Sequence, residues 1–192
     1  MKSRPQFDHD IHELLRARWS PRAFTPKPVE PEIVLRLFEA ARWAASANNE
    51  QPWRFIQATQ EQPELYKRLF DCLVPANQEW VKTAPLLVMT VVRVVFDSGK
   101  PNRWAFHDLG LAVGNLTTQA TSMGLYVHNM AGFSVDKARQ TFALPPELEP
   151  VTMIAIGYLG DPAQLSPRNQ ERELAVQQRK PLSELLLIKK PS

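Results

Sequence analysis

Cysteine occurs only once in the 192 residues, at Cys72. A single cysteine excludes a disulfide within the chain and a cysteine cluster for zinc, and it is typical of a reducing compartment. The sequence also lacks an apolar run long enough to span a bilayer, since the most apolar stretch, residues 86–96, is interrupted by Arg93. We therefore expect a soluble, cytoplasmic protein without a membrane partner.

Glycine is scarce as well. The chain has seven glycines, and none lies in the glycine-rich turn of a dinucleotide-binding fold or in a phosphate loop. A cofactor that carries a phosphate would therefore have to be held by side chains. The excess of positive charge is also small, with 23 basic and 20 acidic residues and a net charge of +3. Because general nucleic-acid binding needs a broad cationic face, we expect no nucleic-acid partner.

The spacing of histidines does not favour a metal site. His9 and His12 lie three residues apart, but no third ligand with suitable spacing follows them. We therefore expect no bound metal. His107 and His128 remain open to two interpretations, because each is compatible with a hydrogen-bonded residue near the core or with a proton donor.

Apolar periodicity predicts helices and strands over about the first 160 residues. Residues 86–95 form an apolar, β-branched run that is typical of a central strand buried on both faces. Residues 102–123 contain no proline and repeat apolar residues at helical spacing, with Gly110 and Gly114 allowing a neighbour to approach closely. Further helices are predicted at residues 8–17, 34–45, 61–74 and 134–144, and further strands at residues 53–59, 125–130 and 151–160.

The chain length and composition predict one domain, residues 1–192. From Asp161 onward the sequence is polar and proline-bearing and shows no regular apolar pattern. We expect an extended tail over residues 161–192, which would be ordered by lying along its own domain or along a partner subunit.

The segment RARWSPRAF, residues 16–24, places arginines on both sides of a hydroxyl group. Arg18 and Arg22 flank Ser20, so that all three side chains could converge on one anion. Arginine suits phosphate because its planar fork donates two parallel hydrogen bonds and keeps its charge. Arginines at the end of a helix also complement the helix dipole, and spacing alone does not decide between the two roles.

The segment SANNEQPW, residues 46–53, gathers amide and hydroxyl groups directly before an aromatic residue. Such groups can match the donor and acceptor edge of a heterocycle, while Trp53 supplies an apolar wall. The same composition is also typical of an ordinary loop.

Taken in order, these segments resemble the nitroreductase family of FMN-dependent oxidoreductases. R-W-S-x-R-x-F is followed by a helix, by S-x-N-N-x-Q-P-W running into a strand and by NQEWVKTAPLLVMTV. SMGL after the long helix, then AGF, IAIGYLGD and the late RKPLSELL complete the family's usual order, so that the resemblance covers nearly the whole chain. It implies an α+β fold with a mainly antiparallel sheet flanked by helices. It also implies an intertwined homodimer, with the long central helix at the interface and the C-terminal tail on the partner.

The resemblance implies a binding site for FMN built from three segments and one late arginine. Arg18, Ser20 and Arg22 match the loop that binds the phosphate and ribityl chain, with Trp19 contributing its backbone. Arg179 matches a basic residue that completes the phosphate site. The candidate cofactor-binding residues are Arg18, Trp19, Ser20, Arg22, Ser46, Asn48, Asn49, Gln51, Asn77, Asn129, Met130, Ala131, Gly132 and Arg179.

The other segments match positions around the flavin ring. Ser46, Asn48 and Asn49 match positions that approach the flavin from the other subunit, and Gln51 lies in the same motif. Residues 129–132 match the segment that lies against the isoalloxazine.

Two residues are assigned by the resemblance to particular edges of the ring. The backbone N–H of Gly132 is expected near the reactive N5, and Arg22 is expected near N1. Asn77 is added as a further candidate.

The implied function is an FMN-dependent oxidoreductase that takes a hydride from NADH or NADPH. By a ping-pong mechanism it would then reduce a small organic acceptor, such as a nitroaromatic, a quinone or an enone. The reactive centre belongs to the cofactor, so no side chain is assigned a certain catalytic role. Two other classes stay open, namely a flavin-binding carrier or sensor without rapid turnover and a purely structural dimer domain.

Overall fold

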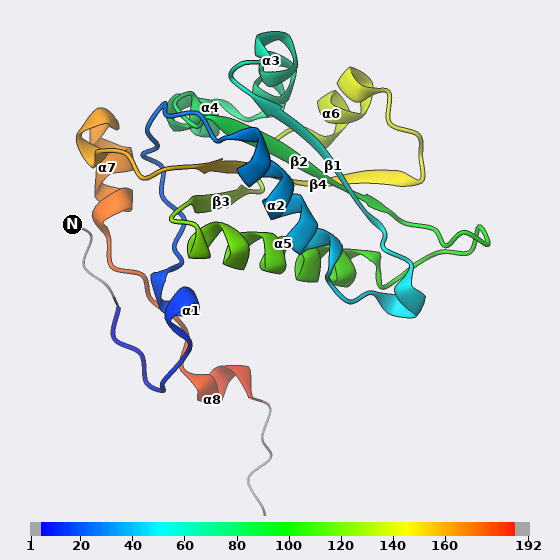
Figure 1. The fold of residues 1–192 in the computed structure, drawn as a ribbon, viewed down its shortest axis with the longest axis horizontal. Helices are drawn as coiled ribbons and strands as arrows, with labels where there is room; N and C mark the ends of the chain where they lie inside the picture. The colour runs from blue at the N-terminus through cyan, green and yellow to red at the C-terminus, as the bar shows by residue number, and fades with distance from the viewer. Residues whose placement is uncertain (1–4, 187–192) are drawn as a thin grey trace, which may run out of the picture.

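A four-stranded antiparallel sheet forms the centre of the molecule (Figure 1). The structure is a computed structural model, and it describes residues 5–186. The strand order is β1-β2-β4-β3, and each neighbouring pair runs antiparallel. The strands are β1 (Trp53–Thr59), β2 (Leu86–Arg93), β3 (Tyr126–Met130) and β4 (Leu148–Gly157). The predicted antiparallel α+β architecture is thus confirmed.

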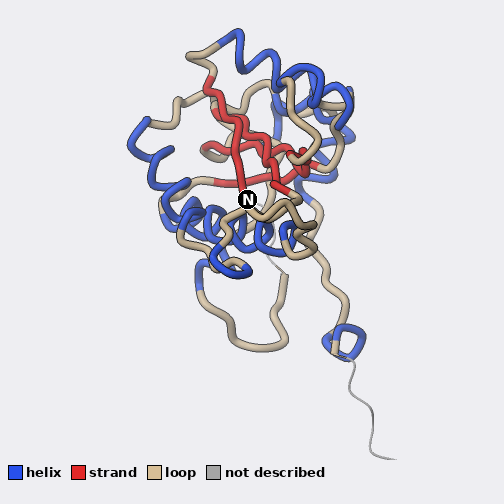
Figure 2. Tube along the Cα trace, turned by 90° about the vertical axis from the view of Figure 1, so that its right-hand side faces the viewer, coloured by secondary structure: helices blue, strands red, loops and turns tan. Residues whose placement is uncertain are grey.

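Helices cover both faces of the sheet, as two views at right angles show (Figures 1 and 2). On one face lie α2 (Pro31–Arg42) and the long α5 (Ala105–Ser122). The other face is covered by α3 (Pro63–Cys72), α4 (Pro75–Val81) and α6 (Val135–Phe142). The sequence did not predict α4, a short helix in which only Trp80 and Val81 are buried.

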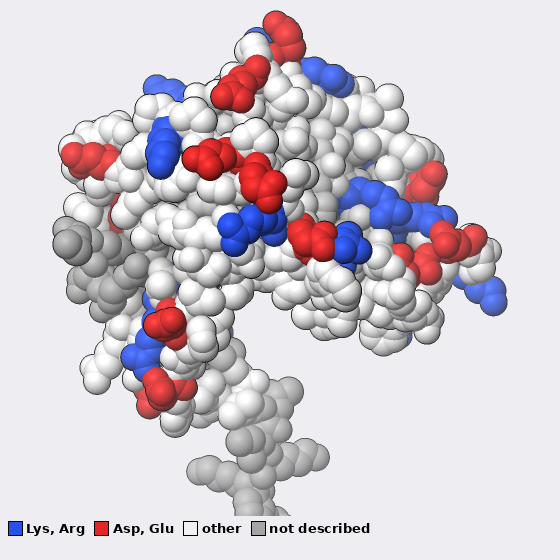
Figure 3. Space-filling view, in the orientation of Figure 1, with Lys and Arg blue, Asp and Glu red and all other residues white. Residues whose placement is uncertain are grey.

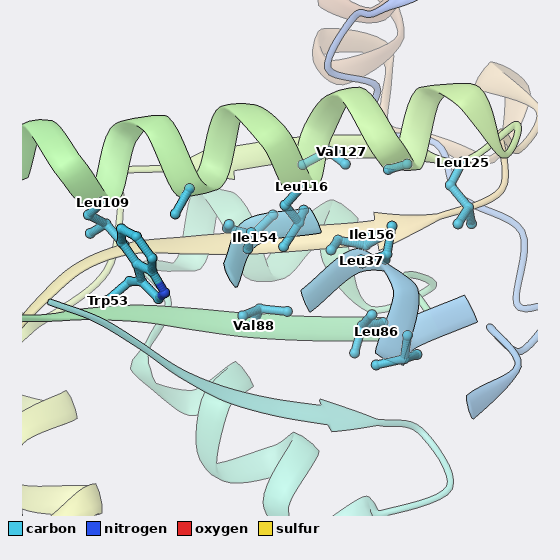
Figure 4. Packing of buried hydrophobic residues seen from close by; sticks show 14 of the residues in the cluster. Leu37, Trp53, Leu86, Val88, Leu109, Leu116, Leu125, Val127, Ile154 and Ile156 are labelled. Atoms are coloured by element: carbon cyan, nitrogen blue, oxygen red, sulfur yellow. The ribbon is translucent and has the colours of Figure 1, made fainter. Parts of the chain in front are cut away.

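Strand β2 shows why both faces need a helical layer. Alternate side chains of a strand point to opposite faces. Leu86 and Val88 pack toward α2 and α5, as Figure 4 shows, whereas Leu87 and Met89 pack toward α3, α4 and α6. Each large apolar side chain that is removed from water in this way stabilises the fold by about 1.5–3 kcal/mol. The prediction of a central strand buried on both faces is confirmed.

Helix α5 forms much of the core but also presents an exposed side. Leu109, Leu116 and other apolar residues of α5 pack on the sheet (Figure 4). Gly110 and Gly114 lie on the exposed side, where an added Cβ would have no atom within 4 Å. Glycine inside a helix is less favourable than alanine by about 1 kcal/mol, and packing among residues 5–186 does not require it at these two positions.

The two ends of the described chain differ from the sequence-based expectation. Helix α1 (Glu13–Ala17) is shorter than predicted and begins where Nδ1 of His12 accepts a hydrogen bond from the Leu14 N–H, 3.2 Å away. The extended tail expected from Asp161 is wrong for its first part, which forms η2 (Pro162–Gln164) and α7 (Pro167–Leu174).

Beyond α7 the chain runs away from the body toward α8 (Leu182–Leu185), as both views show (Figures 1 and 2). Residues 176–180 and the apolar side chains of α8 border an open groove of about 590 Å³ together with the N-terminal segment, residues 5–11. The last residues of the predicted tail, 187–192, lie outside the described part of the chain. None of the helices within residues 5–186 is both long and apolar enough to cross a membrane.

Candidate functional site

The loop between α1 and α2 carries the predicted anion-binding residues, and it is anchored on β3. Trp19 is 4% exposed, and its ring meets that of Tyr126 edge to face at a centroid distance of 5.9 Å. Phe24, in the middle of the loop, is fully buried and stacks on Trp80 at 6.4 Å. Two buried aromatic side chains therefore fix the first half of the loop, and Ser20 and Arg22 lie between them.

Arg18, Ser20 and Arg22, next to or between these anchors, form a donor set that suits a phosphate. Nη1 of Arg18 donates a hydrogen bond to Oγ of Ser20 across 3.4 Å, so these two groups lie together. The Arg22 guanidinium is partly buried, and burial lowers its pKa from the ordinary value while the nearby Glu173 carboxylate opposes that change. Two guanidinium groups and a hydroxyl on one loop match the charge and acceptor oxygens of a phosphate, so the residues present fit this part of FMN.

His128 lies beneath this loop and is held as a neutral ring. Its Nδ1 donates a hydrogen bond to the carbonyl oxygen of Pro21 over 2.7 Å, and its ring lies 4.6 Å from that of Trp80. Burial lowers the pKa of His128 to about 4, although the hydrogen bond to Pro21 opposes this shift. At neutral pH the ring is therefore uncharged, and His128 supports the loop rather than supplying a proton.

A second group of candidates meets at the start of α4. Nδ2 of Asn77 donates to the carbonyl oxygen of Gly132 over 3.0 Å, and the Val74 N–H donates to the same oxygen over 3.1 Å. A Cβ on residue 132 would lie 2.7 Å from Nδ2 of Asn77, closer than packing allows. The structure thus brings Asn77 and Gly132 together, and only glycine fits this approach. Asn129 and Met130, the last residues of β3, and Ala131 lead directly into this contact.

The third group, residues 46–51, forms a turn with an unusual backbone. Asn48, Asn49 and Gln51 adopt positive φ angles of 54°, 56° and 50°. Oγ of Ser46 accepts a hydrogen bond from the Gln51 N–H over 3.0 Å, which closes the turn. Such left-handed conformations are uncommon for residues other than glycine and cluster at functional sites, so the turn is a candidate for ligand contact. Within it, Ala47–Asn49 form the short helix η1.

A buried carboxylate on α5 holds this turn from behind. Oδ2 of Asp108 accepts a hydrogen bond from the Ala47 N–H over 3.0 Å, and Asp108 is 2% exposed. Beside it, an open hollow of about 270 Å³ combines apolar and polar walls. The residues that line this hollow are Ala45, Ser46, Ala47, Trp104, His107, Asp108 and Leu111.

Within one chain the structure does not bring the two polar loops together. Residues 46–51 pack at the beginning of α5, whereas Trp19 contacts Tyr126, which follows the end of α5. The helix has 18 residues, a length of about 27 Å at 1.5 Å per residue. Figure 1 shows the turn that contains η1 and the segment after α1 at opposite ends of this helix.

Arg179 lies in the tail rather than beside the loop in the same chain. Its Nη1 donates to the backbone oxygen of Gln178 over 2.8 Å, and it borders the groove shared with residues 5–11. Arg16, which has no assigned role in the site, pairs with Asp10. From the family resemblance, Arg179 was predicted to complete the phosphate site with Arg18 and Arg22, whereas Arg16 was given no role; residue type alone does not distinguish them.

Neither Glu173 nor Asp108 was assigned a role from the sequence. Asp108 lies in the first turn of α5, where an acidic residue is common for reasons of the helix dipole alone. Glu173 lies in a polar segment without apolar periodicity, so nothing in the sequence distinguishes it from exposed carboxylates nearby. Both are recognisable only from their burial in the folded chain.

The described residues contain no cluster of three or more histidine, cysteine, aspartate or glutamate side chains that could hold a metal ion. On the face seen in Figure 3, basic and acidic side chains are interspersed. Among the candidate residues of the loop after α1, the structure brings Arg18 and Ser20 together.

Comparison with known proteins identifies the family. The family model described as "Nitroreductase family" matches residues 15–158. A curated protein of Stenotrophomonas maltophilia, named "Putative NADH dehydrogenase/NAD(P)H nitroreductase", is 26% identical over 180 residues, which are 82% of this chain and 89% of that protein.

Solved structures agree with this match. A crystal structure of an oxidoreductase containing FMN is similar with a TM-score of 0.89 and 31% identity, over 97% of this chain and 96% of that chain. A nitroreductase family protein from Clostridium difficile 630 has the same fold, with a TM-score of 0.73 and 24% identity, over 95% of this chain and 100% of that chain. The chain belongs to the nitroreductase family of flavin-dependent NAD(P)H oxidoreductases.

Proposed function

We propose that this oxidoreductase binds FMN through the loop after α1 and uses electrons from NADH or NADPH to reduce a small organic acceptor. The observation that carries the proposal is the donor set of Arg18, Ser20 and Arg22 on a loop anchored by buried aromatic rings. The FMN named for a similar structure supports the choice of cofactor. The name of the curated relative supports NAD(P)H as the electron donor and a nitro compound as the acceptor, and we propose a quinone or an enone as further acceptors.

The protein's own residues contribute position and charge to a ping-pong reaction. FMN, when bound, supplies the redox chemistry by accepting a hydride from NAD(P)H and passing the electrons to the second substrate. Arg18, Ser20 and Arg22 would hold the phosphate and the ribityl chain, and Arg22 would also supply positive charge toward the N1 edge of the ring. Residues 129–131 would lie along the ring, and the N–H of Gly132, whose carbonyl is held by Asn77 and Val74, would be the group nearest N5.

We further propose that residues 1–192 act as one domain in a homodimer with two composite sites. Residues 46–51 lie at the far end of α5 from the phosphate loop, so their side chains would reach the flavin of the partner subunit. Gly110 and Gly114 would let the two α5 helices approach closely.

The C-terminal part of the chain would complete such a dimer. The part of residues 161–192 that follows α7 would pack on the partner. There Arg179 would complete the phosphate site. Several large apolar side chains of the two terminal segments are exposed in the single chain, and burial against a partner would stabilise them. They are Phe7, Ile11, Leu15, Val176, Leu182, Leu185 and Leu186.

An anaerobic absorption spectrum of the purified protein, reconstituted with FMN, tests the proposed enzyme. We expect a bound flavin spectrum that bleaches within seconds of adding NADH or NADPH and returns when a nitroaromatic or a quinone is added. A bound flavin that bleaches only over many minutes would indicate a carrier or sensor. A protein that stays colourless after incubation with FMN would overturn the proposal and leave a structural dimer domain.

A further inference from the structure

Glu173 is a buried carboxylate that has no place in the flavin chemistry described above. It lies on α7, and only 1% of its surface is exposed. Burying a carboxylate costs several kcal/mol unless charged or hydrogen-bonding partners compensate. A residue of this kind is retained only where its partners need it, so its contacts indicate its role.

The contacts of Glu173 include two backbone N–H groups of the loop after α1. Oε2 of Glu173 accepts from the Arg22 N–H over 2.7 Å, and Oε1 accepts from the Ala23 N–H at 3.4 Å. One carboxylate thus holds two successive peptide groups, one of which belongs to an arginine of the proposed FMN site. Hydrogen bonds to a charged group are stronger than those between neutral groups.

The rest of this loop is held from the same side. The Gly160 N–H donates to the carbonyl oxygen of Ala23 over 2.9 Å, and Nε2 of Gln164 donates to that of Phe24 over 2.9 Å. The Thr25 N–H donates to the carbonyl oxygen of Tyr158 over 2.9 Å. Residues 158–173 therefore satisfy the backbone of residues 22–25, and the side chain of Arg22 projects from a loop whose peptide planes are fixed.

We propose that Glu173 is a positioning residue that pre-organises the loop of Arg18, Ser20 and Arg22 to bind FMN. The inference rests on the proposed function, because it takes this loop to be the FMN site. Fixing both peptide planes at residues 22 and 23 sets the path of the loop and the Cα–Cβ direction of Arg22 before the ligand arrives, which lowers the entropic cost of binding. The site would thus depend on a residue about 150 positions away in the chain that does not touch the cofactor.

Because Glu173 is charged, its replacement by a neutral residue can either tighten or weaken FMN binding, and the direction of the change tests the proposal. A carboxylate beside Arg22 lowers the positive potential that a phosphate meets, so its neutralisation should tighten FMN binding if charge alone matters. If Glu173 acts by orientation, the same neutralisation should weaken FMN binding. Gln in its place keeps the shape but offers one acceptor oxygen for two N–H groups.

The experiment compares Glu173→Gln with wild type for two ligands, FMN and riboflavin, which lacks the phosphate. We expect the dissociation constant for FMN to rise at least tenfold in E173Q and that for riboflavin to rise by a clearly smaller factor, because riboflavin lacks the phosphate that Arg18 and Ser20 would hold. Glu171→Gln removes an exposed carboxylate from the same helix and serves as the matched control, which should leave both constants within twofold of wild type.

Each other result has a defined meaning. Unchanged or tighter FMN binding by E173Q would overturn the positioning role, as would an equal loss for both ligands, which indicates general damage to the fold. A wild-type protein that binds FMN no better than riboflavin would contradict the proposed phosphate site itself.

If E173Q does not fold, a measurement on the wild-type protein tests the inference instead. We expect the amide hydrogens of Arg22 and Ala23 to exchange slowly in the flavin-free protein, because Glu173 holds them before any ligand binds. Exchange at the rate of an unstructured segment would overturn the inference.

Discussion

At the scale of single residues, the candidate site is organised by buried polar side chains that bind backbone rather than ligand. Glu173 holds the peptide groups after Pro21, His128 holds the Pro21 carbonyl, and Asp108 holds the Ala47 N–H. Each bond joins a loop to a helix or strand of the core. The exposed polar groups of the loops are therefore presented by backbones that have few other conformations, as a pre-organised binding site requires.

Arg18 is the residue whose loss should affect the cofactor most directly. Removing its guanidinium in Arg18→Ala deletes a charge-assisted hydrogen bond of about 2 kcal/mol, which corresponds to roughly a 30-fold weaker affinity for FMN. Fluorescence titration with FMN measures this loss, and the thermal unfolding temperature should stay within a few degrees of wild type. Arg16→Ala is the control, because Arg16 is paired with Asp10 on the exposed N-terminal segment. Equal affinity of the two variants for FMN would count against the phosphate assignment.

Because His128 is buried, the free energy of unfolding should depend on pH. Its pKa of about 4 in the folded chain lies below the ordinary value of 6.5, because burial disfavours the charged ring. The unfolded chain therefore binds more protons between these two values, and stability is lost as the pH falls from about 6.5 to about 4, by up to about 3 kcal/mol. The groups facing the ring are the carbonyl of Pro21, the indole of Trp80 and the positive charge of Arg22.

The measurement is the free energy of unfolding by urea at pH 7.5 and pH 5 for wild type and His128→Gln. Carboxylates titrate in both proteins, so the difference between the two pH dependences isolates the histidine. We expect wild type to lose about 1–2 kcal/mol more than the variant between these pH values. Equal losses would show that the ring does not resist protonation.

At the scale of elements, the sequence predicted best where buried residues are apolar. β2 and α5 were predicted within three residues at each end, because their apolar side chains repeat with the period of the element. Helix α6 was predicted at residues 134–144 and begins where Oγ of Ser134 accepts from the Lys137 N–H. The apolar pattern therefore sufficed for the sheet and for the helices that cover it, except for the short α4.

Helix α7 and the turn at residues 46–51 show where such a pattern fails. The buried residues of α7 are Asn169 and Glu173, so its inward side carries no apolar signal. The positive φ angles of Asn48, Asn49 and Gln51 depend on contacts with Ser46 and Asp108 that no local pattern reveals. The residues of the candidate site were found by motif order instead, and the carboxylates behind them required the folded chain.

Asp108 should determine the shape of the turn that contains η1. Asp108→Asn can replace the acceptor oxygen by an amide N–H₂ group and removes the charge that strengthens the bond to the Ala47 N–H. We expect a loss of about 1–3 kcal/mol in the free energy of unfolding and faster amide exchange at residues 46–51. The matched control is Asp136→Asn, which changes an exposed aspartate in the first turn of α6. If both substitutions lower the free energy of unfolding equally, Asp108 stabilises the protein through the helix dipole and not through its buried hydrogen bond.

At the scale of the whole molecule, the candidate residues of one chain lie in two separate groups. The loop after α1 contacts Tyr126 beyond one end of α5, and residues 46–51 lie at its other end. A two-fold axis across the exposed side of α5 would place each group next to the other group of the partner. The terminal segments extend away from the body (Figures 1 and 2), and they carry exposed apolar side chains that a second chain could cover.

A mixing experiment tests whether the sites are composite. One chain carries Arg18→Ala, and the other carries Asn48→Gly, which removes the amide side chain while glycine keeps the positive φ without strain. Each variant alone should lose most of its activity. In a heterodimer isolated with two different tags, one site contains both substitutions and the other contains neither, so activity should return to about half that of a wild-type dimer.

The intact site of the heterodimer distinguishes the possible arrangements of the chains. If Arg18 and Asn48 served the same flavin within one chain, every site of the heterodimer would carry one substitution, and mixing would restore nothing. A heterodimer of the Arg18→Ala and Arg16→Ala chains is the control, in which the Arg16→Ala chain supplies an unaltered phosphate loop. The activity of this control should also be about half that of wild type, so the two heterodimers should be equally active. A much lower activity of the heterodimer that carries Asn48→Gly would show that Asn48 acts within its own chain.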